Sequence, residues 1–151
     1  MSGAVTLTPG KALVSLVNLV TLIGPYLADW NETHMYNPNW PPHARYHNGQ
    51  TMTIGLFTGV ITPYVLFVLE PRAASPDVKR AYLGWVLALQ NIVYLSSLSG
   101  ILYPGAGWAD PQFGEGKSQL YMFPVLVVMV WVGWWVEVRR VERGGVGEKK
   151  G

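Results

Sequence analysis

The run MFPVLVVMVWVGWWV, at residues 122–136, decides the fold class of this chain because it contains no charged residue and no polar face. A helix in a soluble four-helix bundle needs polar residues on one side, recurring with a period of about 3.6 residues. This run has no such pattern, so we interpret it as part of a helix that is surrounded by lipid. The soluble bundle is the alternative that the pattern disfavours.

Three more apolar runs precede this one, and half of the 151 residues are hydrophobic while only 13% are charged. A helix needs about 20 apolar residues to cross a hydrocarbon layer of ~30 Å. The first run lacks a strongly basic start and a clear cleavage site, so we interpret it as a retained helix. We therefore predict an all-α polytopic membrane protein, a single domain over residues 1–151. It is a bundle of four transmembrane helices, with a tail at 137–151 and helices near 12–28, 49–69, 81–102 and 120–136.

Lysine and arginine are distributed unevenly between the two sides of this four-span topology. Nine of the eleven lie on the side of the termini and the 70–80 loop, and only Arg45 and Lys117 lie on the other. Positive residues favour the cytosolic side, so we predict cytosolic termini and two longer luminal loops, at 29–48 and 103–117. A eukaryotic chain of this kind is expected in the endoplasmic reticulum. The basic residues are scattered and lie beside the membrane, which argues against nucleic-acid binding.

The chain contains no cysteine. This excludes disulfides, thiolate catalysis and cysteine-based metal sites. It also excludes a membrane reductase that works through a dithiol.

The segment DWNETHMYNPNWPPHARYH, at residues 29–47, holds all three histidines between two uncharged apolar runs. Ionisable groups beside hydrocarbon are costly and usually mark function. If the second helix starts near Pro42, His43 and His47 lie one turn apart on one face, with Gln50 below them. Tyr46 would flank that stripe.

Two carboxylates, Asp29 and Glu32, lie at the end of the first helix. Helices one and two should be antiparallel neighbours, so we expect their luminal ends to bring several groups together for general acid–base catalysis. These catalytic candidates are Asp29, Glu32, His34, His43, Arg45 and His47. A structural explanation stays open for each residue, including a salt bridge between Asp29 and Arg45.

Five further residues are candidates for binding a substrate: Trp30, Tyr46, Gln50, Asn91 and Tyr94. Asn91 and Tyr94 share a face of the third helix, where polar side chains either hold helices together or line a pocket. Trp30 also suits the aromatic belt at a membrane surface.

Metal binding is the second interpretation of the same segment. Histidine and carboxylate side chains can ligate zinc or iron, and the ligands would be His34, His43 and His47. No HExxH motif and no Glu-x-x-His pair on a second helix is present. We therefore expect chemistry that needs no cofactor.

The same segment resembles a family of small four-span membrane proteins that is common in fungi and found in bacteria. The family pattern is ADWN-x-[ST]-H…NP-x-WPPH-[AT]-[KR]-[FY]-H, which here reads ADWNETH (28–34) and NPNWPPHARYH (37–47). This resemblance implies the four-span fold rather than a function. A weaker resemblance, without residue-by-residue correspondence, is to small fungal membrane proteins of polyketide and terpenoid pathways that hydrolyse epoxides or close ether rings.

These observations favour a membrane enzyme that performs epoxide hydrolysis, cyclisation or isomerisation on a lipophilic small molecule entering from the bilayer. A carboxylic acid or an imidazolium would protonate an oxygen, Asp29 or another carboxylate would activate water or an internal hydroxyl, and Arg45 would stabilise negative charge. Two alternatives stay open, a non-enzymatic membrane subunit or binding protein and a metalloenzyme. The sequence does not decide between a monomer and a homo-oligomer.

Overall fold

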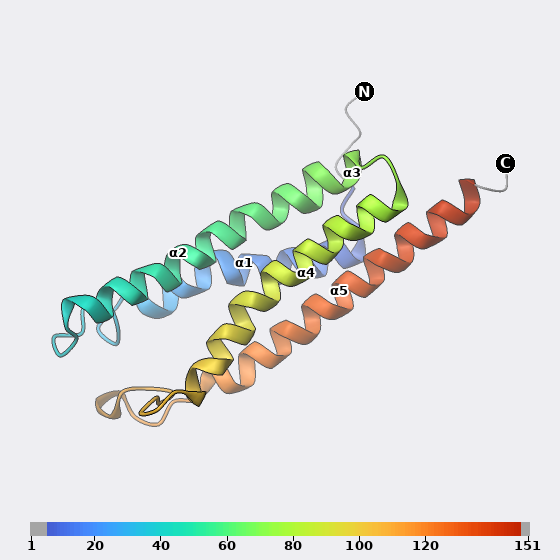
Figure 1. Ribbon diagram of the computed structural model, residues 1–151. Helices are drawn as coiled ribbons and strands as arrows, with labels where there is room; N and C mark the ends of the chain where they lie inside the picture. The colour runs from blue at the N-terminus through green and yellow to red at the C-terminus, as the bar shows by residue number, and fades with distance from the viewer. Residues whose placement is uncertain (1–5, 149–151) are drawn as a thin grey trace.

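The computed structural model describes residues 6–148, which form an antiparallel bundle of helices without a strand (Figure 1). The four long helices are α1 (Pro9–Asp29), α2 (Pro42–Tyr64), α4 (Pro76–Ser99) and α5 (Ser118–Glu148). The short elements are the π-helix η1 (Val65–Leu69), α3 (Glu70–Arg72) and the 3-10 helices η2 (Gly100–Leu102) and η3 (Pro111–Phe113).

Four segments are long and apolar enough to cross a membrane, which confirms the predicted fold class. They are Pro9–Asp29, Pro42–Arg72, Pro76–Leu102 and Ser118–Gly144. Large apolar side chains such as Phe57, Trp85 and Ile92 lie on the outside of the bundle. A soluble monomer rarely exposes so much contiguous apolar surface, so this surface is consistent with an integral membrane protein.

The ends of the bundle differ in what they carry. The described parts of both termini lie at one end, here called the terminal end, and the connections 30–41 and 103–117 lie at the other, the loop end (Figure 1). Helix α1 packs mainly against α2 and α5, and α4 packs mainly against α5. Direct packing between α1 and α4 is slight, which leaves room between them. Which end faces the cytosol stays a prediction.

Close contact between α1 and α2 depends on glycine. A Cβ atom added at Gly59 would lie 2.6 Å from Leu22 Cβ, and one added at Gly55 would lie 2.8 Å from the Thr21 carbonyl oxygen. Small residues spaced by four let helix backbones approach closely in membranes. This approach fixes α1 beside α2 through the middle of the bundle.

Four charged side chains form an ion cluster, three of them buried, at the terminal end. Lys11 Nζ lies 2.7 Å from Glu70 Oε2, and Arg140 bonds Glu70 Oε1 at 3.3 Å and Glu137 Oε2 at 2.7 Å. The Thr8 hydroxyl donates to Glu137. Lys11, Glu70 and Glu137 are almost fully buried. The cluster joins α1, α3 and α5, and its two cations are among the nine basic residues that predict the cytosolic side.

The helices extend beyond the predicted apolar runs. Helix α2 begins at Pro42, and its π-helical continuation carries it to Glu70 in the ion cluster. Helix α5 continues to Glu148, so the tail predicted at 137–151 is helical as far as it is described. Pairing between Glu137 and Arg140 explains how charged residues continue an apolar helix. Helix α4 begins at Pro76, ahead of the apolar run at 81–102, because the Ser75 hydroxyl caps it by accepting a hydrogen bond from Val78 N.

Candidate functional site

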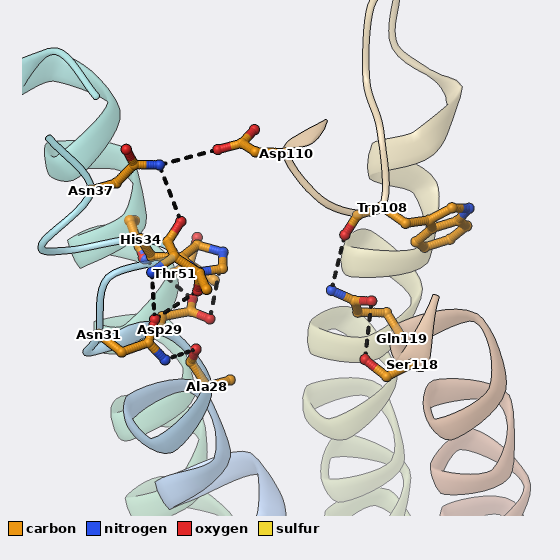
Figure 2. A network of polar contacts seen from close by, with 12 residues as sticks. Ala28, Asp29, Asn31, His34, Asn37, Thr51, Trp108, Asp110, Ser118 and Gln119 are labelled. Carbon is orange, nitrogen blue, oxygen red and sulfur yellow. Dashed lines mark hydrogen bonds and ion pairs between the residues drawn. The ribbon is translucent and has the colours of Figure 1, made fainter. Parts of the chain in front are cut away.

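A cavity of about 710 Å³ lies at the loop end, between the halves of α1, α4 and α5 that are nearest the loops. Its walls within the bundle are mainly apolar, whereas its mouth is polar. Mouth residues are Asp29, His34, Trp40, Thr51, Trp108, Ser118 and Gln119. A second pocket of about 400 Å³ shares most of these residues and lies toward the loops. Figure 2 shows the mouth residues in two groups, one from α1, α2 and the first loop and one from the second loop and α5.

Asp29 and His34 form a pair at this mouth. Asp29 is the last residue of α1, and His34 follows in the turn that closes back on it, where Met35 N donates to the Asp29 carbonyl. His34 Nε2 lies 3.8 Å from Asp29 Oδ1. This separation is too long for a hydrogen bond, so each atom retains capacity for a third group. Both residues line both cavities.

The turn that carries His34 determines which imidazole nitrogen holds the proton. Asn31 Nδ2 donates to the Ala28 carbonyl, so Asn31 Oδ1 turns toward Thr33 and accepts from both its backbone N–H and its hydroxyl. The Thr33 proton is therefore used, and Thr33 Oγ1 accepts from His34 Nδ1 at 2.6 Å. A neutral His34 then has an unprotonated Nε2 facing Asp29, as a general base requires.

Asn48 on α2 positions the carboxylate from the other side. Its Nδ2 donates to Asp29 Oδ2 at 3.2 Å, and its Oδ1 is buried without a partner among the described residues. Rotation of the amide by 180° would let Oδ1 accept from a protonated Asp29, so Asn48 can bond the acid in either state. Asn48 is not among the predicted site residues. Its place on the helical face opposite the histidine stripe was the one signal that could have indicated it.

Loop residues close the outer side of the site. Trp40 Nε1 and Asn37 Nδ2 both donate to Asp110 Oδ2, at 3.0 and 3.2 Å, and so join the first loop to the second. The His34 ring packs edge-on against Trp40, with centroids 5.1 Å apart. Arg45 NH2 donates to the buried Asn37 carbonyl at 2.8 Å. Figure 2 shows Asn37 reaching toward Asp110 above His34.

The structure does not bring all six predicted catalytic residues together. His43 and His47 lie on an exposed face of α2, with their Nε2 atoms 2.9 Å apart, and neither lines the cavities at the mouth. Tyr46 stacks beside His43, and Gln50 bonds His47 Nδ1 at 2.8 Å. The rotation of α2 about its axis explains why His43 and His47 lie away from Asp29. Because Asn48 faces Asp29, the histidine stripe on the opposite face of α2 points outward.

The remaining predicted residues are also dispersed. Glu32 is exposed and lines neither mouth cavity, and Arg45 bonds a loop carbonyl rather than Asp29, so the suggested salt bridge between them is absent. Trp30 is exposed and donates to the Tyr36 hydroxyl. Asn91 Oδ1 accepts a hydrogen bond from Trp131 Nε1, which joins α4 to α5, and Asn91 Nδ2 donates to the Leu87 carbonyl within α4. Tyr94, in contrast, lines the main cavity.

The three histidines do not form one ligand set. His34 borders the main cavity, whereas His43 and His47 form a separate exposed pair. Within residues 6–148 no three histidine, cysteine or carboxylate side chains converge as metal ligands would. The alternative ligand set of His34, His43 and His47 is therefore not brought together in this part of the chain, and the leading expectation of chemistry without a cofactor stays a prediction.

The chain belongs to a family of unknown function, DUF6640, whose family profile matches residues 13–147. The match spans all four long helices and both loops of the site. Comparisons with curated proteins and with solved structures found no significant match.

Proposed function

We propose that this protein is a membrane-embedded enzyme that performs acid–base chemistry on a lipophilic small molecule in the main cavity. The observation that carries this proposal is the Asp29–His34 pair at the polar mouth of a cavity that continues into the apolar bundle. A concave apolar site with a few convergent polar groups is the usual form of a small-molecule site.

The pair has the composition of a reversible proton carrier. With Asp29 ionised and His34 neutral, Oδ1 and Nε2 are both acceptors, and they lie 3.8 Å apart. In that state, the pair can accept a proton from water or from a substrate hydroxyl that lies between them. The resulting imidazolium or carboxylic acid can return the same proton to a substrate oxygen. The pair therefore regains its starting state, as hydrolysis, cyclisation and isomerisation all require.

The surroundings favour a lipophilic substrate. Val20, Ile101, Met122 and Phe123 line the main cavity inside the candidate membrane spans. Burying apolar surface contributes about 25 cal/mol per Å², so an apolar molecule gains affinity along these walls. Its reacting oxygen would lie at the mouth, between the carboxylate and the imidazole.

A comparison of lipophilic metabolites tests this proposal. The native host would carry Asp29→Asn, His34→Gln or the matched control Glu32→Gln, because Glu32 is a nearby but exposed carboxyl group outside the cavities. We expect the first two variants to accumulate one lipophilic metabolite, and the purified wild type to convert it. Loss of a positioned acid or base typically lowers a rate by on the order of 10²–10⁴-fold.

The control and the binding measurement make the outcomes distinct. Glu32→Gln should leave metabolite levels unchanged, and all three proteins should reach the membrane in equal amounts. A compound that binds the purified wild type but is never converted would support a binding protein instead. Normal metabolite levels in both Asp29→Asn and His34→Gln would refute the proposed chemistry.

A further inference from the structure

The floor of the main cavity carries a second polar group, deep within the bundle and separate from the Asp29–His34 pair. Thr21 on α1 and Tyr94 on α4 both line the cavity, and their hydroxyl oxygens lie 2.7 Å apart. Gln90 lies behind them, fully buried, and connects to Asn18 and Thr62. Buried polar side chains in a membrane span either join helices or mark a ligand path.

The directions of these hydrogen bonds are fixed by a backbone carbonyl. Asn18 Nδ2 donates to the Gly59 carbonyl at 2.9 Å, so Asn18 Oδ1 must accept from Gln90 Nε2. The second proton on Gln90 Nε2 goes to Thr62 Oγ1 at 3.0 Å. Gln90 Oε1 is then an acceptor, and Thr21 Oγ1 donates to it at 2.6 Å. Each amide orientation follows from the one before it, starting at Gly59.

The single proton of Tyr94 is also directed into the protein. Its two neighbours are Thr21 Oγ1, whose own proton is used, and the Val17 carbonyl at 3.2 Å, and both are acceptors. The Tyr94 oxygen can therefore accept a hydrogen bond from a ligand, but its proton is already used. A ligand that donates gains a bond without breaking one, whereas a ligand that only accepts must take the Tyr94 proton from Thr21 and Val17.

We infer that the floor of the main cavity, at Tyr94 and Thr21, recognises a hydroxyl group of an elongated lipophilic alcohol. Asp29 lies eight positions after Thr21 on α1, which places the floor about 12 Å from the mouth at about 1.5 Å per helical residue. The substrate class is thus an apolar molecule with a hydroxyl roughly that far from its reacting oxygen. The reacting end of this inference rests on the proposed function, but recognition at the floor does not.

Binding of two matched probes tests the inference without turnover. One probe is a linear α,ω-diol with hydroxyls about 12 Å apart, and the other is its bis-methyl ether, which has no O–H to donate. Affinities are measured by titration calorimetry on the full-length protein in detergent. We expect Tyr94→Phe to weaken binding of the diol roughly fivefold, the usual value of one neutral hydrogen bond. Binding of the ether should not change.

Two further variants separate this inference from the proposed function. Tyr64→Phe changes an exposed tyrosine outside the cavity and should leave both affinities unchanged. Asp29→Asn alters the mouth, and the Tyr94→Phe effect on the diol should persist in its background. If the proposed chemistry fails but this effect persists, floor recognition stands by itself.

The result that overturns the inference is equally definite. The inference fails if Tyr94→Phe weakens binding of both probes by the same factor or of neither probe. It also fails if the wild type binds neither probe. NMR of the wild type with isotope-labelled tyrosine provides a measurement that does not depend on folding of the variant. The Cζ resonance of Tyr94 should shift with the diol and not with the ether, and equal shifts with both would count against hydroxyl recognition.

Discussion

Replacing Glu70 by glutamine should destabilise the bundle far more than the same change at Glu142. Glu70 is almost fully buried and bonds two cations, Lys11 at 2.7 Å and Arg140 at 3.3 Å. In Glu70→Gln, Lys11 stays buried without its anionic partner; its remaining contacts are neutral, the glutamine amide oxygen, the Leu66 carbonyl 2.9 Å away and the face of the Phe67 ring. Removing one partner of a buried ion pair costs about 3–5 kcal/mol.

Glu142 is the matched control because it also lies near two cations but remains partly exposed. Its carboxylate is 3.3 Å from Arg139 and 3.7 Å from Arg80, with 36% of its side chain exposed. Exposed ion pairs contribute about 0–1 kcal/mol. Thermal unfolding in detergent, followed by tryptophan fluorescence, measures the difference. At about 2–4 °C per kcal/mol for chains of this size, Glu70→Gln should lower Tm by roughly 6–20 °C.

A double variant tests the physical reason for this loss. Lys11→Met combined with Glu70→Leu removes both members of this buried pair together, and an apolar replacement of a buried pair is often neutral. We therefore expect the double variant to recover much of the Tm lost in Glu70→Gln, although Arg140 would lose one partner. Equal Tm shifts for Glu70→Gln and Glu142→Gln would refute the reasoning.

Three further predictions concern packing, the site and topology. Gly59→Ala should destabilise the fold by about 1–3 kcal/mol because its Cβ would overlap Leu22, whereas Gly49→Ala should have little effect on thermal unfolding because that position is open. His34→Gln should reduce turnover of the identified metabolite far more than His43→Gln, and equal losses would contradict the assignment of the site. In sealed vesicles of known orientation, protease added on the cytosolic side should remove the C-terminal tail. Cleavage only from the opposite side would contradict the predicted topology.

The sequence predicts the spans better than their ends. Apolar runs locate all four helices because hydrocarbon requires about 20 apolar residues, and this requirement is local. The extension of α2 to Glu70 depends on partners that are distant in sequence. Glu70 extends α2 while buried because Lys11 and Arg140 neutralise it, and no pattern around residue 70 identifies those partners. Glu137 differs, because Arg140 lies three residues further along the same helix.

The site shows the same division between local and distant information. Asp29 and His34 lie five residues apart, and a single turn brings them together, so the sequence indicates this pair. Asn48 and Asp110 reach the site only through the rotation of α2 and the contact between two loops. The spacing of His43 and His47 predicts correctly that they share a face, but it does not reveal which way that face turns.

The distribution of strong contacts explains how one bundle can hold both a stable core and a large cavity. The atoms that line a space of about 710 Å³ have no packing partners on one side and lose dispersion energy. Strong contacts lie elsewhere, in the ion cluster at the terminal end, in the glycine contacts of α1 with α2 and in the Gln90 network. That network joins α1, α2 and α4 on the side of the cavity that faces the terminal end. It therefore supports the floor, while α1 and α4 remain apart toward the loop end. The polar side chains that fix the helices are therefore the same ones that shape the deep end of the proposed site.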